Sequence, residues 1–89
     1  MSRGAPRVQT SAPEITDEII TRVLEQVSDA VGDARDATPM TPEQAAVAVV
    51  ERGEWAMVRR HRAAMRRDLA KVATAAIMGI AALDAGAKP

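Results

Sequence analysis

Residues 41–85 read TPEQAAVAVVERGEWAMVRRHRAAMRRDLAKVATAAIMGIAALDA, and this stretch decides the fold. After Pro42 it contains no proline, and good helix formers such as Ala, Arg, Met, Leu and Glu dominate it. Thr41 and Gln44 fit a capping box, and Pro42 stands at the first helical position, where no N–H is needed. Gly86 can adopt the left-handed conformation that ends many helices. The stretch therefore predicts one long helix over about 42–85, or two collinear helices hinged at Gly53.

A shorter amphipathic helix is predicted before it, over about residues 14–36. Ser11 and Thr16 are both suitable residues to cap its N-terminus. Its apolar face carries residues that recur every three or four positions, as in a coiled coil: Ile15, Ile19, Ile20, Val23, Leu24, Val27 and Val31. A turn over 37–41 with Pro39 follows, so an antiparallel helical hairpin is the expected arrangement. Residues 1–13 have no periodicity and are predicted to be a flexible N-terminal arm.

The composition predicts one all-α domain over residues 14–89 with a thin core. The chain has 89 residues, and Trp55 is its only aromatic residue. Small chains bury a modest fraction of their surface, so we expect this fold to be completed by oligomerisation. Cysteine is absent, which excludes disulfides and thiol chemistry. No apolar signal-peptide core is present, so a cytoplasmic location is the expectation.

The net charge of zero conceals a strong asymmetry along the chain. Residues 14–51 carry nine acidic side chains against Arg22 and Arg35, and residues 52–71 carry seven basic side chains against Glu54 and Asp68. Opposite charges on two parts of one chain suggest complementary surfaces. These surfaces are expected to meet within one hairpin or between two copies.

Residues 72–83 are apolar on every side of a helix, which indicates burial on every side. Twelve residues are too few to cross a bilayer, which needs about 20, so no transmembrane segment is expected. We therefore expect this segment and the first helix to contact protein: a second copy of the chain or a larger partner. The candidate interface residues are Ile20, Leu24, Val27, Val31, Trp55, Met65, Leu69, Val72, Ile77, Ile80 and Leu83.

An arginine-rich segment offers an alternative function as a nucleic-acid-binding module. Guanidinium groups suit phosphate, and several such contacts give salt-dependent binding. The residues concerned are Arg59, Arg60, Arg62, Arg66, Arg67 and Lys71. No aromatic residue is interleaved with them for base stacking, and no recognition motif is visible. In the other interpretation, these side chains neutralise the acidic first helix and solvate a long rod.

Three ionisable residues, Glu54, His61 and Asp68, follow each other at intervals of seven. They could form a pH-sensitive or metal-binding layer between helices. Seven residues span about 10 Å of helix, so one helix cannot chelate an ion through two of them. The alternative is that they lie at the edge of the apolar face and pair with arginines. No metal or cofactor is expected.

The sequence shows no catalytic motif. His61 is the only histidine, and no serine or cysteine nucleophile stands near it in the sequence. We expect a non-enzymatic helical protein that self-associates or docks on a larger protein through apolar faces. Nucleic-acid binding is the alternative, and binding to a membrane surface through the basic and apolar segments together is a third.

Overall fold

The computed structural model describes residues 13–37 and 39–88, and every regular element in these ranges is a helix. Helix α1 comprises Asp17–Ala37, α2 comprises Pro42–Val58, and α3 comprises Arg62–Asp84. The all-α class is thereby confirmed. The flexible arm and the capping role of Ser11 concern residues that, apart from residue 13, lie outside the described part of the chain.

The helix ends follow the local chemistry that the sequence predicts. At the start of α2, Thr41 Oγ1 accepts from the Gln44 backbone N–H at 3.1 Å, and Gln44 Oε1 accepts from the Thr41 N–H at 3.0 Å. At the start of α1, Thr16 Oγ1 accepts from the Ile19 N–H at 3.2 Å. After α3, Gly86 has a φ of 102°, and its N–H donates to the Leu83 carbonyl. The predicted caps at Thr16 and Thr41 and the glycine stop are confirmed.

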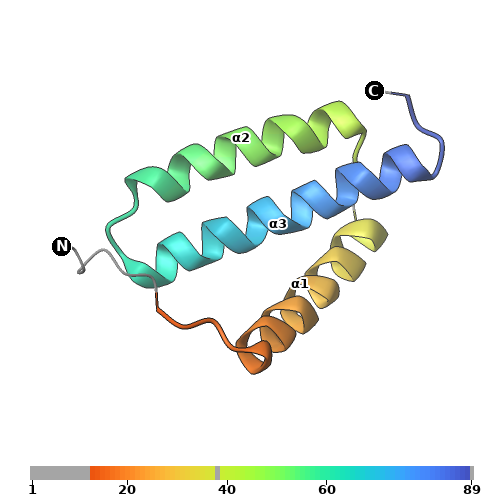
Figure 1. Ribbon diagram of the computed structural model, residues 1–89. Coiled ribbons are helices and arrows are strands. Elements are labelled where there is room, and N and C mark those ends of the chain that lie inside the picture. Colours follow the sequence, from red (N-terminus) through yellow and green to blue (C-terminus); the bar gives the residue numbers. More distant parts are fainter. Residues whose placement is uncertain (1–12, 38, 89) are drawn as a thin grey trace, which may run out of the picture.

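The prediction of one helix over about 42–85 is wrong, because the chain turns between α2 and α3. Arg59 and His61 have extended backbones, with φ/ψ of −72°/133° and −92°/123°. Gly53, the expected hinge, lies inside α2. Extended dihedrals at two of three consecutive residues interrupt the helical hydrogen-bond ladder, and the chain reverses direction at this point (Figure 1).

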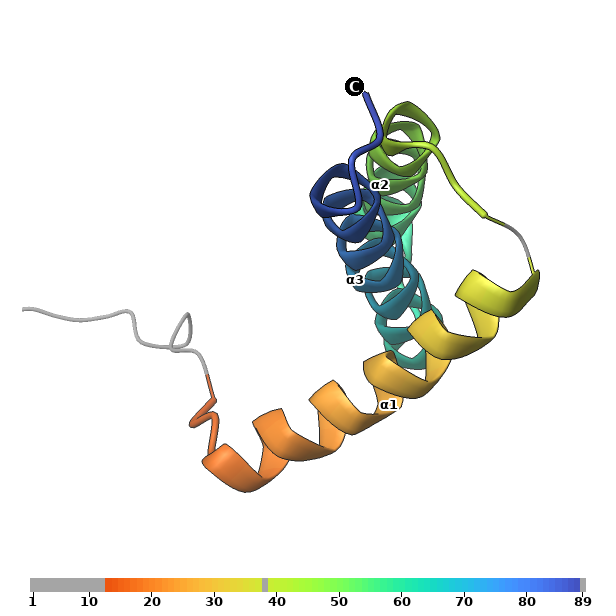
Figure 2. The ribbon, with the colours of Figure 1, turned by 90° about the vertical axis from the view of Figure 1, so that its right-hand side faces the viewer.

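Helix α3 occupies the centre of the molecule, with α2 on one side and α1 on the other (Figure 1). Helices α2 and α3 run antiparallel along their length. Helix α1 crosses α3 steeply, and its N-terminal half extends beyond the other two helices (Figure 2). In the described residues α1 packs on α3 but not on α2. The hairpin is therefore formed by α2 and α3, not by the first two helices as the short 37–41 connection suggested.

Small residues bring α2 and α3 close together. Ala45, Ala56, Ala75 and Gly79 are all buried. A Cβ placed on Gly79 would lie 2.8 Å from the Cβ of Ala45, a distance that real Cβ atoms do not adopt. The absence of a side chain at position 79 therefore sets the separation of the two helices.

The contact between α1 and α3 is smaller and centres on Val27. This side chain is 6% exposed, and it is the only buried residue that the structure shows within α1. A shallow groove beside it is lined by Val23 and Val27 of α1 and by Leu69, Ala70 and Ala73 of α3. One hydrogen bond also joins the helices, from the Arg66 guanidinium to Gln26 Oε1 at 2.6 Å.

Candidate functional site

Large apolar side chains are distributed mainly on the outside of this molecule. In the described residues the buried apolar side chains are Val27, Met78 and three alanines. A much larger set is substantially exposed: Ile15, Ile19, Ile20, Val23, Leu24, Val47, Val50, Trp55, Met57, Val58, Met65, Leu69, Ile77, Ile80 and Leu83. Single exposed apolar residues are ordinary, but contiguous exposed patches mark interaction sites. Most of these residues fall into three rows, each carried by a different helix.

The first row lies on α1. Ile19, Ile20, Val23 and Leu24 share the side of the helix that carries Val27, given the 3.6-residue period. Val27 is covered by α3 because it lies at the crossing, whereas the preceding residues belong to the half of α1 that projects past the hairpin. Leu24 is 60% exposed as a result. We call this set, with Ile15, the α1 row.

A second row lies on the C-terminal half of α3. Ile77, Ile80 and Leu83 continue the side of α3 on which Leu69 and Ala73 meet α1. Helix α1 covers only the earlier part of this side, so these three side chains remain exposed. On the side of α3 that faces α2, by contrast, three residues of this segment are buried: Ala75, Met78 and Gly79. Residues 72–83 are thus buried on one side only in this structure, not on every side.

A third row lies on the outer face of α2 and comprises Val47, Val50, Met57 and Val58. Val47 and Val58 lie roughly half a turn away from the buried Ala45 and Ala56, so they point away from α3. These residues are absent from the candidate interface set proposed above. Helical periodicity within residues 42–58 places all four on one face.

The predicted interface residues thus separate into three groups. Val27 is buried in the α1–α3 contact, and Val31 and Val72 are half-buried. The remaining members are exposed, on all three helices: Ile20, Leu24, Trp55, Met65, Leu69, Ile77, Ile80 and Leu83. The structure does not gather them on one surface.

A partly buried ion pair joins the two sides of the α2–α3 turn, and for Asp68 it agrees with the alternative that this residue pairs with an arginine. Asp68 of α3 is 1% exposed, and its Oδ2 accepts from Arg59 Nε at 2.8 Å. The Arg59 guanidinium also lies 5.0 Å from the centre of the Trp55 ring, within cation–π range. The Arg59 hydrogen bond lowers the pKa of Asp68; burial opposes this shift, and the charges of Arg59, Arg67 and Arg52 reinforce it.

Among Glu54, His61 and Asp68, which are spaced by seven residues, only Asp68 makes an ion pair in the part of the chain that the structure describes. His61 lies in the α2–α3 turn and Glu54 is exposed on α2. The three therefore do not form a layer on one helix. Among the described residues no group of three or more His, Asp or Glu side chains is arranged to hold a metal ion.

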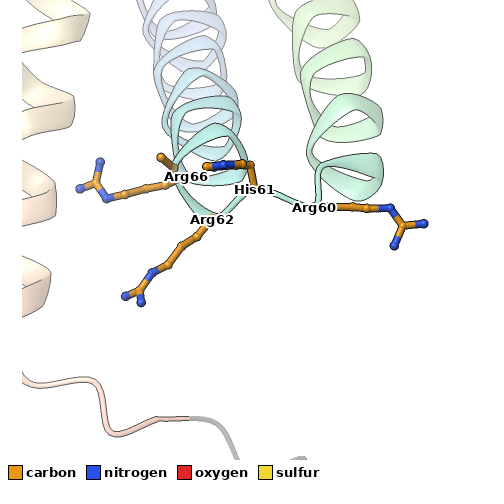
Figure 3. Close-up of a pocket in the computed structure, with 5 residues that line it drawn as sticks. Arg60, His61, Arg62 and Arg66 are labelled. Atoms are coloured by element: carbon orange, nitrogen blue, oxygen red, sulfur yellow. The ribbon is translucent and has the colours of Figure 1, made fainter.

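The arginine-rich segment lies at the α2–α3 turn, where Arg60, His61, Arg62 and Arg66 line an open depression of about 500 Å³ with Ala63. Figure 3 shows Arg60 pointing away from Arg62 and Arg66. Two members of the predicted basic set are engaged within the molecule: Arg59 with Asp68 and Arg66 with Gln26. Arg67 and Lys71 are exposed. The basic side chains consequently do not converge on one point.

Comparison with protein-family models, with curated proteins and with solved structures found no match to this chain. None of the helices in the described ranges is both long enough and apolar enough to cross a membrane.

Proposed function

We propose that this protein is a non-enzymatic helical assembly protein that self-associates through its exposed apolar rows. The observation that supports this most directly is the α1 row: four exposed aliphatic side chains on the N-terminal half of α1, which projects past the hairpin, together with Ile15 just before this helix. Burying a large aliphatic side chain contributes about 1.5 to 3 kcal/mol. A second molecule that covers this row would supply apolar burial that the thin monomer core lacks.

Charge distribution favours a second copy as the molecule that covers it. The exposed acidic side chains of α1 include Asp17, Glu18 and Glu25, and exposed arginines lie at the α2–α3 turn. One copy therefore carries both a negative and a positive surface. Since the net charge is zero, two copies do not repel each other overall.

The test is the solution mass of the parent protein and of Leu24→Asp, measured by light scattering over a range of concentrations. Leu24 is exposed in the monomer, so Asp at this position leaves the monomer fold intact but places a charge in the contact. We expect an oligomer for the parent and at least a tenfold weaker association for the variant. Thr21→Asp, on the polar side of the same helix, is the matched control and should associate like the parent.

Other outcomes separate the competing functions. A parent that stays monomeric at every concentration would refute self-association and direct attention to a larger protein partner. Co-purified nucleic acid that high salt removes would favour the arginine-rich segment as the functional surface, because phosphate contacts weaken with salt. An unchanged mass in Leu24→Asp would show that the α1 row is not the contact.

A further inference from the structure

The hairpin places the exposed apolar residues of α2 and α3 on opposite sides of the molecule. On α2, Val47 and Val58 point away from α3, since Ala45 and Ala56 occupy the inner face. On α3, Leu69 lies on the side that meets α1. Because α3 lies between α2 and α1, these two surfaces cannot be buried together in the hairpin (Figure 1).

On one continuous helix Val47, Val58 and Leu69 fall on a single face, together with three further apolar residues. At 100° per residue, the members of this set lie within an arc of about 60°. They are Val47, Val58, Met65, Leu69, Val72 and Leu83. A helix running from residue 42 to residue 84 would therefore carry one straight stripe across the position of the turn, apolar except for Glu51 and Glu54. Two separately evolved helices of a hairpin have no need of this common phase.

The turn itself lacks the chemistry that stops a helix. Arg59, Arg60 and His61 contain no glycine, proline or short polar cap. His61 makes no side-chain capping hydrogen bond, and the first turn of α3 has no acidic residue. Arginine is instead present there, at the positive end of the helix dipole, where it is unfavourable. The start of α2 and the end of α3, by contrast, are capped by Thr41 and Gly86.

The Arg59–Asp68 pair is the interaction that distinguishes the two forms. In the hairpin these side chains meet across the turn at 2.8 Å. In a continuous helix, nine residues would separate them by about 13 Å along the axis and by roughly half a turn around it. The pair therefore exists only when the turn is formed, and the two forms exclude each other.

Charge indicates how two such helices would pair. Residues 42–58 carry Glu43, Glu51 and Glu54 against one arginine, while residues 62–84 carry four basic side chains against two acidic ones. An antiparallel pair places the negative half of each helix against the positive half of the other, and a parallel pair places like charges together. The second helix that fits this stripe is thus the same helix of another copy.

We propose that, in the assembled protein, α2 and α3 become one continuous helix that pairs antiparallel with the same helix of a second copy along this stripe. The proposal rests on the proposed self-association and specifies its conformation. The hairpin is then the unassembled form, held closed by Arg59, Asp68 and Trp55.

The experiment measures the distance between two positions of one chain in the assembled protein. The chain has no cysteine, so spin labels can be attached to Ala46→Cys and Ala81→Cys, which are exposed and lie off the stripe. In the hairpin these positions are near each other, because Ala45 contacts Gly79. In the continuous helix they are separated by about 50 Å. Doubly labelled protein diluted into excess unlabelled protein reports the distance within one chain by pulsed electron resonance.

We expect the fraction of molecules that show the long distance to increase with protein concentration, in parallel with the solution mass. Arg62→Pro should prevent both changes: position 62 is the first residue of α3, where proline is favoured, and His61 is already extended. Arg62→Ala, which removes the same charge, should behave like the parent. An oligomer that keeps only the short distance, or Arg62→Pro assembling like Arg62→Ala, would overturn the continuous helix and leave self-association standing. A parent that is monomeric throughout would overturn both.

Discussion

The two contacts made by α3 differ in kind, although the same helix supplies both. Towards α2, α3 presents small residues and one buried charge, and the helices approach so closely that a single methyl group does not fit at position 79. Towards α1, it presents Leu69, Ala70 and Ala73 beside one buried valine of α1. The first contact is specific because close packing and an ion pair both require one register. The second leaves most of its apolar side chains uncovered and is therefore open to further association.

The largest effect is expected where α2 and α3 are closest. In Gly79→Val the new Cβ would overlap Ala45 Cβ, and an alanine Cβ has no alternative rotamer by which to move away. We expect a loss of about 3 kcal/mol in the free energy of unfolding, measured with urea. Gly53→Ala is the matched control: nothing lies within 4 Å of a Cβ at that position, so this helical glycine should gain about 0.5 to 1 kcal/mol on replacement. Equal behaviour of the two variants would show that close packing at residue 79 does not hold the hairpin.

A smaller effect, and one that depends on pH, is expected at the ion pair. The pKa of Asp68 is lowered from its ordinary value of 3.8 by the Arg59 hydrogen bond. The stabilisation is therefore fully present above about pH 4 and is lost as the pH falls through the lower, folded-state pKa. Asp68→Asn should lower the melting temperature at pH 7 and remove this part of the acid dependence.

Melting curves between pH 2 and pH 7 provide the measurement. Asp84→Asn, at an exposed position near the end of α3, serves as the control and should retain the acid dependence of the parent. If Asp68→Asn and the parent lose stability over the same acid range by the same amount, the pair contributes nothing to the closed hairpin.

The smallest effect is expected at the crossing of α1 and α3. Val27→Ala removes two methyl groups from the one buried position of α1, and should weaken the docking of this helix by roughly 1 to 2 kcal/mol. Hydrogen exchange should then show faster exchange of the α1 amides and unchanged α2 and α3 amides. Leu24→Ala, at an exposed position of the α1 row outside the groove against α3, should leave α1 protected. Loss of protection in all three helices of Val27→Ala would show that the two contacts form one cooperative unit.

The sequence predicted the features that depend on neighbouring residues. Thr41 with Gln44, Thr16 and Gly86 mark helix ends through contacts over three or four positions, and all three were found where expected. The turn after Val58 could not be predicted in this way. The residues of this turn are compatible with a helix. The ion pair that forms across the turn joins Arg59 to Asp68, and nine residues apart these two are not neighbours on the surface of a helix.

The candidate surface was predictable in part for the same reason. Periodicity identified the apolar side of α1, and Val27 does face α3. It could not show that α3 covers only the middle of this side, because the crossing angle depends on how the two helices pack. The arginine-rich segment was predicted as one basic surface, but Arg59 and Arg66 each found a partner inside the molecule. Long-range partners of this kind are not encoded in local spacing.

The contact between Ala45 and Gly79 also constrains how this chain can vary during evolution. The two residues share the space of a single methyl group, so the size allowed at one position depends on the size present at the other. Among descendants of this sequence that keep the hairpin, alanine should become acceptable at position 79 once glycine has replaced Ala45. Such a correlated exchange would record the closed α2–α3 contact in the sequences themselves.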